Sequence, residues 1–143
     1  MLPVILTKKQ KVLIVGAGKA CKIKLKVLQT HPCEITVVAN EFLCELDESI
    51  EKIQKDFKEL SEDFFESFDL IYIGIELSDT TLVQKLLKTK MVNVLSNPSL
   101  SNFIHPCTRD DGDIMVSVAN LNTPNPKKAC ALANEFIEYK KSK

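Results

Sequence analysis

A short apolar run that ends in a glycine turn constrains the fold of this chain more than any other segment. The run Lys11–Val15 is rich in β-branched residues, the turn Gly16–Gly18 follows at once, and residues 19–30 have the pattern of a helix. A strand, a Gly-x-Gly turn and a helix in this order form the phosphate-binding unit of dinucleotide-binding domains. We therefore expect an α/β domain that begins with this unit.

The turn itself predicts an anion-binding site. Gly16 permits a tight turn, and Gly18 lets the backbone approach a pyrophosphate. The N-terminus of the following helix offers free N–H groups and the positive end of its dipole to that anion. Cys21 stands where a third Gly or Ala is usual; a thiol is small, but it weakens the motif. The cofactor-binding residues expected in this segment are Gly16, Ala17, Gly18, Lys19 and Ala20.

Alternating strand and helix patterns continue along the chain. Apolar, β-branched runs predict strands at residues 35–39, 70–75, 92–95 and 114–118, with a weaker candidate at 53–55. Helical patterns occur at residues 42–51, from Ser61 onward, at 80–88 after Ser78 as N-cap, and at 127–139 with Pro126 in the first turn. This order predicts a Rossmann-like, doubly wound parallel sheet with helices on both faces.

Composition indicates one globular chain without a strong overall electric field. The 143 residues carry 19 basic and 19 acidic side chains, so net charge favours neither a nucleic acid nor a membrane as partner. No apolar run has membrane-spanning length and the N-terminus lacks a signal-peptide pattern, so we expect a cytoplasmic protein. The five cysteines are odd in number and include no Cys-x-x-Cys pair. This predicts reduced thiols rather than disulfides or a zinc site.

Ligands of open α/β sheets bind beyond the carboxyl ends of the strands. Glu41 follows Gly18 by about 20 residues, the spacing at which an acidic side chain bonds the adenosine ribose; the same residue is equally well placed to begin the next helix. No arginine stands nearby to favour a 2′-phosphate, so NAD is preferred to NADP as the cofactor. Beside the glycine turn, we expect Asn40, Glu41 and Asp79 to contact this cofactor.

Further segments resemble a known family. Leu2–Leu6 precedes the first strand, and Asn93–Pro98 is followed by Phe103–Pro106, a Phe-Ile-x-Pro segment. Through nearly its whole length the chain resembles the precorrin-2 dehydrogenase family, the N-terminal part of siroheme synthases. The resemblance implies NAD-dependent oxidation of precorrin-2 to sirohydrochlorin, with insertion of ferrous iron in some members. It also implies a homodimer that uses the segment after Phe-Ile-x-Pro.

The resemblance assigns residues and parts of the chain to these tasks. It implies an NAD-binding Rossmann-like domain over residues 1–110 and a strand–helix dimerisation segment over 111–143. Asn97 and His105 are expected to contact the tetrapyrrole substrate. His105 with Cys107 forms a His-x-Cys pair that could touch iron, but two ligands do not make a metal site, and none is predicted.

The chain differs from the family at the positions that are expected to catalyse the reaction or bind the cofactor. Ser96 stands where the family has the Asp that is the leading candidate for proton transfer, and a serine without a neighbouring base does not take a proton. Either Asp79 or the Asp110–Asp113 cluster could substitute, although such a cluster more often forms a polar turn. Glu76 brings a carboxylate near the expected pyrophosphate, and the loop 119–126 lacks the glycines of the family.

Three hypotheses therefore stay open. The first is an NAD-dependent precorrin-2 dehydrogenase in which Ser96 takes the catalytic position. The second is a dinucleotide- or tetrapyrrole-binding module that kept the fold and lost the reaction, which Ser96, Glu76 and the changed loop favour. The third, a redox sensor that uses Cys21 at the phosphate turn, rests on one residue.

Overall fold

The computed structural model describes residues 1–122 and 125–143, which form two compact units, Met1–Ile104 and His105–Lys143. Thr123 and Pro124, part of the loop 119–126, lie outside the described residues. No helix in the described residues is long and apolar enough to cross a lipid bilayer. The functional division expected between residues 110 and 111 stays a prediction.

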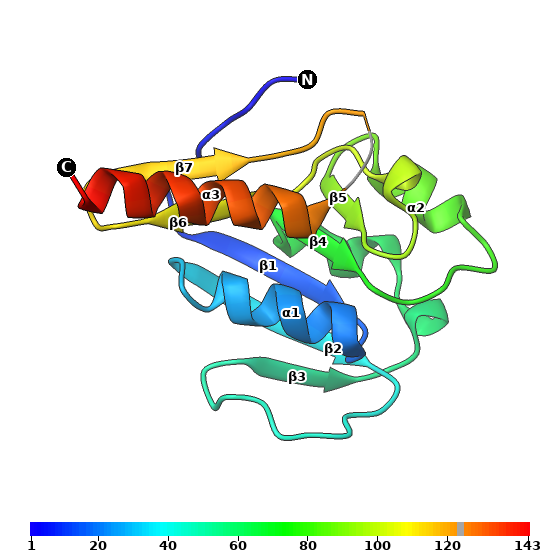
Figure 1. Ribbon diagram of the computed structural model, residues 1–143. Helices are drawn as coiled ribbons and strands as arrows, with labels where there is room; N and C mark the ends of the chain where they lie inside the picture. Colours follow the sequence, from blue (N-terminus) through cyan, green and yellow to red (C-terminus); the bar gives the residue numbers. More distant parts are fainter. Residues whose placement is uncertain (123–124) are drawn as a thin grey trace. The chain divides into compact units, whose positions relative to one another are not determined.

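The first unit contains a parallel sheet (Figure 1). Its strands are β1 (Gln10–Val15), β2 (Cys33–Ala39), β3 (Glu51–Gln54), β4 (Leu70–Ile73) and β5 (Met91–Val94). They lie in the order β3-β2-β1-β4-β5, and each neighbouring pair is parallel. The chain moves to one side of β1 with β2 and to the other side with β4, which makes the ends of β1 the topological switch point. The Rossmann-like fold predicted from the sequence is confirmed.

Helices and turns connect these strands. They are α1 (Lys19–Leu28), α2 (Thr81–Leu86) and the 3₁₀ turns η1 (Phe57–Glu59), η2 (Glu62–Ser67) and η3 (Pro98–Leu100). The predicted N-cap at Ser78 is wrong, because Asp79 accepts the hydrogen bonds of the Thr81 N–H and hydroxyl at 2.9 and 2.6 Å. An aspartate two residues before a backbone N–H forms an Asx turn, which starts α2 from outside the helix.

The helix predicted over residues 42–51 is also wrong, since residues 42–50 form a loop and Glu51 begins β3. Its acidic and apolar residues do have helical spacing, but Asp47 accepts hydrogen bonds from the N–H and hydroxyl of Ser49 at 2.9 and 2.6 Å. Such local side-chain bonds compete with helical backbone bonds. The loop still delivers Ile50 to the core, where its side chain is buried. Burial rather than helix formation therefore explains the apolar spacing.

Both faces of the sheet are buried, as the continuous apolar strands require. Val12 and Ile14 of β1 point to the face that α1 covers with Cys21, Leu25 and Leu28. Leu13 and Val15 point to the opposite face, which packs against side chains of η2, α2 and the loops next to them, among them Leu60, Phe65, Phe68, Val83 and Leu86. This two-sided core fixes the carboxyl ends of the strands in place.

The second unit is a hairpin with one helix (Figure 1). The strands β6 (Cys107–Asp110) and β7 (Met115–Val118) are antiparallel, and α3 runs from Pro126 to Lys141. Strand β6 was not predicted, because Cys-Thr-Arg-Asp has neither a long apolar run nor β-branched enrichment. Helix α3 begins as expected at Pro126, with the Asn125 side chain accepting from the Lys128 N–H at 3.0 Å.

One cysteine pair contradicts the prediction of reduced thiols. Cys107 at the start of β6 and Cys130 in α3 form a disulfide across 23 residues of sequence, with Cα atoms 5.3 Å apart. Spacing alone does not reveal such a pair, because it depends on how α3 packs on the hairpin. The other three cysteines are free thiols: Cys21 is buried, Cys33 half-buried and Cys44 exposed.

Candidate functional site

A cavity of about 690 Å³ opens at the carboxyl ends of the strands of the first unit. Segments after four strands line it: the Gly16–Gly18 turn after β1, residues 40–43 after β2, residues 55–58 after β3 and residues 75–82 after β4. These are the places where ligands of doubly wound sheets bind. The volume falls in the range of pockets for small molecules and cofactors.

The glycine turn has the two properties that a phosphate grip needs. Gly16 has a φ of 105°, where side chains are strained, and its N–H donates to the Val38 carbonyl at 2.7 Å. Gly18 precedes α1 in extended conformation, and a Cβ added there would meet no protein atom within 4 Å. The space that a side chain would fill at Gly18 is therefore open to a ligand.

The first turn of α1 has no acidic side chain that would repel an anion in this space. The first helical bond runs from the Lys22 N–H to the Gly18 carbonyl, so the N–H groups of Lys19, Ala20 and Cys21 have no acceptor within the helix. The first turn contains no acid, and Gly18 provides no side-chain cap. Lys19 and Ala20 belong to this turn, but neither side chain lines the cavity. Any contact they make with an anion is thus expected from the backbone.

Cys21 fills the third motif position without weakening the packing. Its thiol lies 3.5 Å from the Val15 carbonyl, to which it donates. A Cβ added to Gly74, directly after β4, would collide with this sulfur. The glycine at 74 therefore makes room for the larger residue at 21. Because burial raises the pKa of the Cys21 thiol, the reactive thiolate that a redox sensor needs is disfavoured.

The segment after β2 brings two expected residues to the cavity. Asn40 and Glu41 both line it, and the Asn40 amide donates to Asp56 Oδ2 at 3.4 Å. The Gln54 amide donates in turn to the Asn40 carbonyl at 3.1 Å, which ties the end of β2 to the end of β3. No helix begins at Glu41, so the alternative that it starts one is wrong. Its contact with a ribose stays a prediction.

Two lysines in the cavity were missed. Parallel pairing of Ala39 with Gln54 places the end of β3 beside the end of β2, so that Lys55 and Lys58 line the same cavity as Glu41. Within the described residues neither lysine forms an ion pair. The sequence did contain a sign of Lys55. Applied to the weak strand near residues 53–55, the rule that ligands bind at strand ends would have included this residue.

The segment after β4 contributes carboxylates of two kinds. Glu76 and Asp79 both line the cavity. Asp79 is occupied by Thr81, whose hydroxyl and N–H lower the pKa of the Asp79 carboxyl. It therefore forms the Asx turn before α2 and is a weak proton acceptor. Glu76 has neither a hydrogen-bond partner nor an ion-pair partner among the described residues, and it shares the cavity with Lys55 and Lys58.

Ser96 and Asn97, the residues expected at the substrate, are engaged by the protein itself. The Ser96 hydroxyl donates to the Ile75 carbonyl at 3.0 Å. The Asn97 side-chain oxygen accepts from the N–H and hydroxyl of Ser99 at 3.3 and 2.6 Å and so caps η3. Neither residue lines the cavity. His105 belongs to the second unit, and its role stays a prediction.

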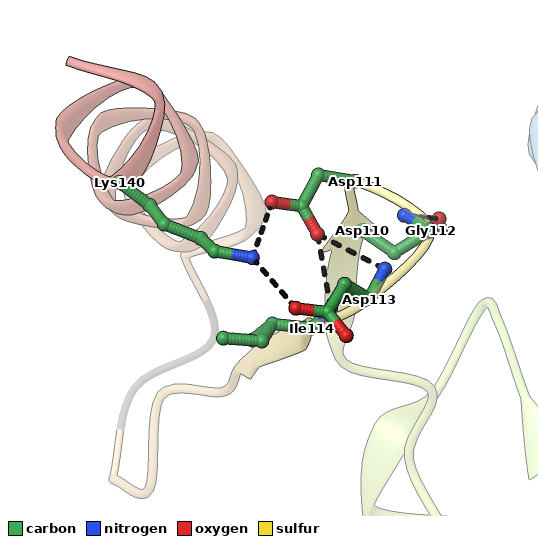
Figure 2. A network of polar contacts seen from close by, with 6 residues as sticks. All are labelled: Asp110, Asp111, Gly112, Asp113, Ile114 and Lys140. Atoms are coloured by element: carbon green, nitrogen blue, oxygen red, sulfur yellow. Dashed lines mark hydrogen bonds and ion pairs between the residues drawn. The ribbon is translucent and has the colours of Figure 1, made fainter. Parts of the chain in front are cut away.

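The acidic cluster of the second unit is a turn (Figure 2). Asp111 lies 2.8 Å from the Lys140 ammonium and accepts hydrogen bonds from the N–H groups of Asp113 and Ile114. The Lys140 hydrogen bond and these two N–H groups hold the pKa of Asp111 far below its usual range. Lys140 also reaches Asp113, at 3.4 Å. Of the two alternatives for this cluster, the structure therefore favours a polar turn over a catalytic base, and no group of metal-ligating side chains occurs in the described residues.

Comparisons with known proteins find a matching family model and similar folds. A model of the family described as "Putative NAD(P)-binding" matches residues 4–107. SirC, precorrin-2 dehydrogenase, is similar over 97% of this chain and 70% of its own, with a TM-score of 0.71 and 19% identity. A putative NADH-flavin reductase from Streptococcus pneumoniae TIGR4 is similar over 87% of this chain and 61% of its own, with a TM-score of 0.49 and 15% identity. No curated protein sequence matches. The family model confirms the expected NAD(P)-binding family, and the similarity to SirC confirms the expected fold.

Proposed function

The chain belongs to the NAD(P)-binding family whose model spans residues 4–107, and on this premise we propose that the cavity at the Gly16–Gly18 turn binds NAD. The open space at Gly18 is the observation that carries the proposal. It lies at the N-terminus of α1, where free N–H groups and the helix dipole stabilise a pyrophosphate. The cavity extends from there past Glu41 toward β3, the direction in which an adenosine ribose fits.

The choice of NAD over NADP depends on opposing charges. Glu41 accepts hydrogen bonds from ribose hydroxyls and repels a 2′-phosphate, whereas Lys55 and Lys58 attract one. We give Glu41 the greater weight because it follows β2, the strand next to the glycine turn, while both lysines come one strand further out. NAD is therefore the proposed cofactor.

The proposed reaction is that of the family the chain resembles, the oxidation of precorrin-2 to sirohydrochlorin. Bound NAD supplies the hydride acceptor for such a step. On this proposal the tetrapyrrole contacts Asn97 and His105, and two copies of the chain associate through the second unit. Iron insertion would be an added activity, for which the described residues offer no preformed group of ligands.

One observation favours a second candidate, a binding module that has lost the reaction. The side chains at positions 96 and 97 form hydrogen bonds within the protein and do not line the cavity, and Asp79 is engaged in the Asx turn before α2. Of the cavity carboxylates, Glu41 and Glu76 have no hydrogen-bond or ion-pair partner among the described residues.

Replacement of Gly18 tests the cofactor proposal. Gly18→Leu should abolish calorimetrically detected NAD binding, because its side chain occupies the space proposed for the pyrophosphate. It should leave the melting temperature within a few degrees of the wild type, since a Cβ there meets no protein atom. Wild-type protein that shows no binding at millimolar NAD, or a folded Gly18→Leu variant that binds normally, would refute the proposal.

Turnover separates the two candidates. Wild-type protein incubated with NAD and precorrin-2 should form NADH and sirohydrochlorin if the reaction is retained. NAD binding without turnover would identify the binding module. Ser96→Asp then distinguishes a single missing base from a wider loss: recovery of turnover indicates an otherwise intact site, and no recovery indicates that several parts are absent.

A further inference from the structure

The two sulfur atoms of the disulfide in the second unit have different surroundings. Cys107 and Cys130 are each half-buried, so the sulfur pair is not sealed in a core. The Arg109 guanidinium lies 3.4 Å from the sulfur of Cys107. Among the described residues no cationic side chain donates a hydrogen bond to the Cys130 sulfur, whereas Arg109 donates one to Cys107. The two sulfurs therefore differ in how well a negative charge on them would be stabilised.

Arg109 is held in this position by two further bonds. Its Nε donates to the Asn134 side-chain oxygen on α3 at 2.7 Å, and its Nη1 donates to the Thr108 carbonyl at 2.8 Å. The guanidinium therefore lies beside Cys107 in a fixed orientation. A cation next to a thiol favours the thiolate, and a thiolate of lower pKa is the better leaving group in disulfide exchange.

From this asymmetry we infer that Cys130 is a site of thiol–disulfide exchange, at which a low-molecular-weight thiol forms a mixed disulfide while Cys107 leaves as a thiolate beside Arg109. The incoming thiolate attacks the Cys130 sulfur, the protein S–S bond breaks, and its electron pair stays on Cys107. A second thiol then attacks the mixed disulfide and releases Cys130. In total, two thiols are oxidised to one disulfide, and the protein disulfide is reduced to two cysteines that receive the two hydrogens.

Opening this bond removes the covalent link between β6 and α3. Three residues of the helix face are buried, namely Ala129, Ala133 and Ile137, and two of them are alanines with little apolar area. A unit this short rarely has a core sufficient for stability by itself. Exchange at Cys130 would thus loosen α3 from the hairpin. The inference does not depend on the nucleotide site.

Peptide mapping of the full-length disulfide-bonded protein tests the inference. The protein is treated with reduced glutathione, quenched with N-ethylmaleimide and digested. Glutathione should appear on Cys130 and the maleimide on Cys107. Arg109→Gln should slow the first exchange step about three- to ten-fold, because the leaving thiolate loses its cation. The matched control Lys140→Gln removes a cation that contacts Asp111 and Asp113, and it should leave the rate unchanged.

Two results would overturn the inference: glutathione attached first to Cys107, or an unchanged exchange rate in Arg109→Gln. If that variant does not fold, the reduced wild-type protein still decides the question. The pH dependence of alkylation should give a lower pKa for Cys107 than for Cys130, and the reverse order would count against Arg109 as the stabilising group. The exposed thiol of Cys44 provides an internal reference for reagent activity.

Discussion

The two units of this chain are stabilised by different means. In the first unit a parallel sheet is covered on both faces, and its core includes fully buried residues of η2, α2 and four strands. In the second unit a short hairpin packs with one helix, which buries Ala129, Ala133 and Ile137 of α3. The disulfide and the Lys140 ion pairs add to this small core. The fraction of its surface that a chain buries on folding rises with domain size. A small unit therefore needs additional stabilising interactions, such as a disulfide or ion pairs.

The comparison also separates the kinds of function that each unit can support. The first unit holds its cavity on strand ends whose backbone is fixed by packing, which suits the precise binding of a dinucleotide. The second unit depends on a bond that thiols can open and on charges that pH can change. We therefore expect ligand binding to be a property of the first unit and sensitivity to conditions a property of the second.

The largest effect is expected in the core of the first unit. Phe65 is fully buried and packs edge-on against Phe57 and Phe64. Phe65→Ala should lower the free energy of unfolding by about 3–5 kcal/mol because it leaves a cavity. Phe136→Ala, at a side chain of the second unit that is 55% exposed, should change it by less than about 0.5 kcal/mol. Urea denaturation followed by circular dichroism measures both; equal effects would contradict the comparison.

The next effect is expected from the disulfide. Replacing Cys107 and Cys130 together by alanine removes a link across 23 residues, which should destabilise the second unit by about 3 kcal/mol on a chain-entropy estimate. Hydrogen exchange should speed up for the amides of α3 and stay unchanged for those of β1. Unaltered exchange in α3 would show that its packing on the hairpin suffices without the bond.

The sequence predicted the first unit better than the second. The strands of the first unit were predictable because Lys11–Val15 and Leu70–Ile75 are apolar runs bounded by turn residues. Strand β6 was not predictable because its sequence is polar, and the disulfide was not because it depends on how α3 packs on the hairpin. In the cavity, Gly16 and Glu41 could be placed by motif spacing. Lys55 could be expected at the end of the weak strand near residues 53–55, but its position beside Glu41 follows from the register of β3 on β2. Contacts set by tertiary register leave no periodic pattern in the sequence.

A smaller effect is expected where β4 meets the glycine turn. Gly74→Ala should destabilise the first unit by about 1–3 kcal/mol, since the added Cβ collides with the Cys21 sulfur. Adding Cys21→Ala should recover most of this loss, because the sulfur is then absent. Gly18→Ala is the matched control, with open space at its Cβ. Urea midpoints of the wild type, Gly74→Ala, Cys21→Ala and the double variant give the coupling between residues 74 and 21; purely additive effects would show that the contact does not limit packing.

The smallest effect concerns the Asp111–Lys140 pair, and its sign depends on pH. Because the pKa of Asp111 is lowered in the folded chain, the pair stabilises the second unit above the unfolded pKa of about 4, and this contribution is lost as the pH falls through the folded value. Lys140→Gln should therefore lower the urea midpoint of the second unit slightly at pH 7 and less at pH 2. Hydrogen exchange of α3 amides, or the urea midpoint, measures this difference. A variant that loses the same stability at both pH values would show that Lys140 acts through packing of its aliphatic part rather than through its charge.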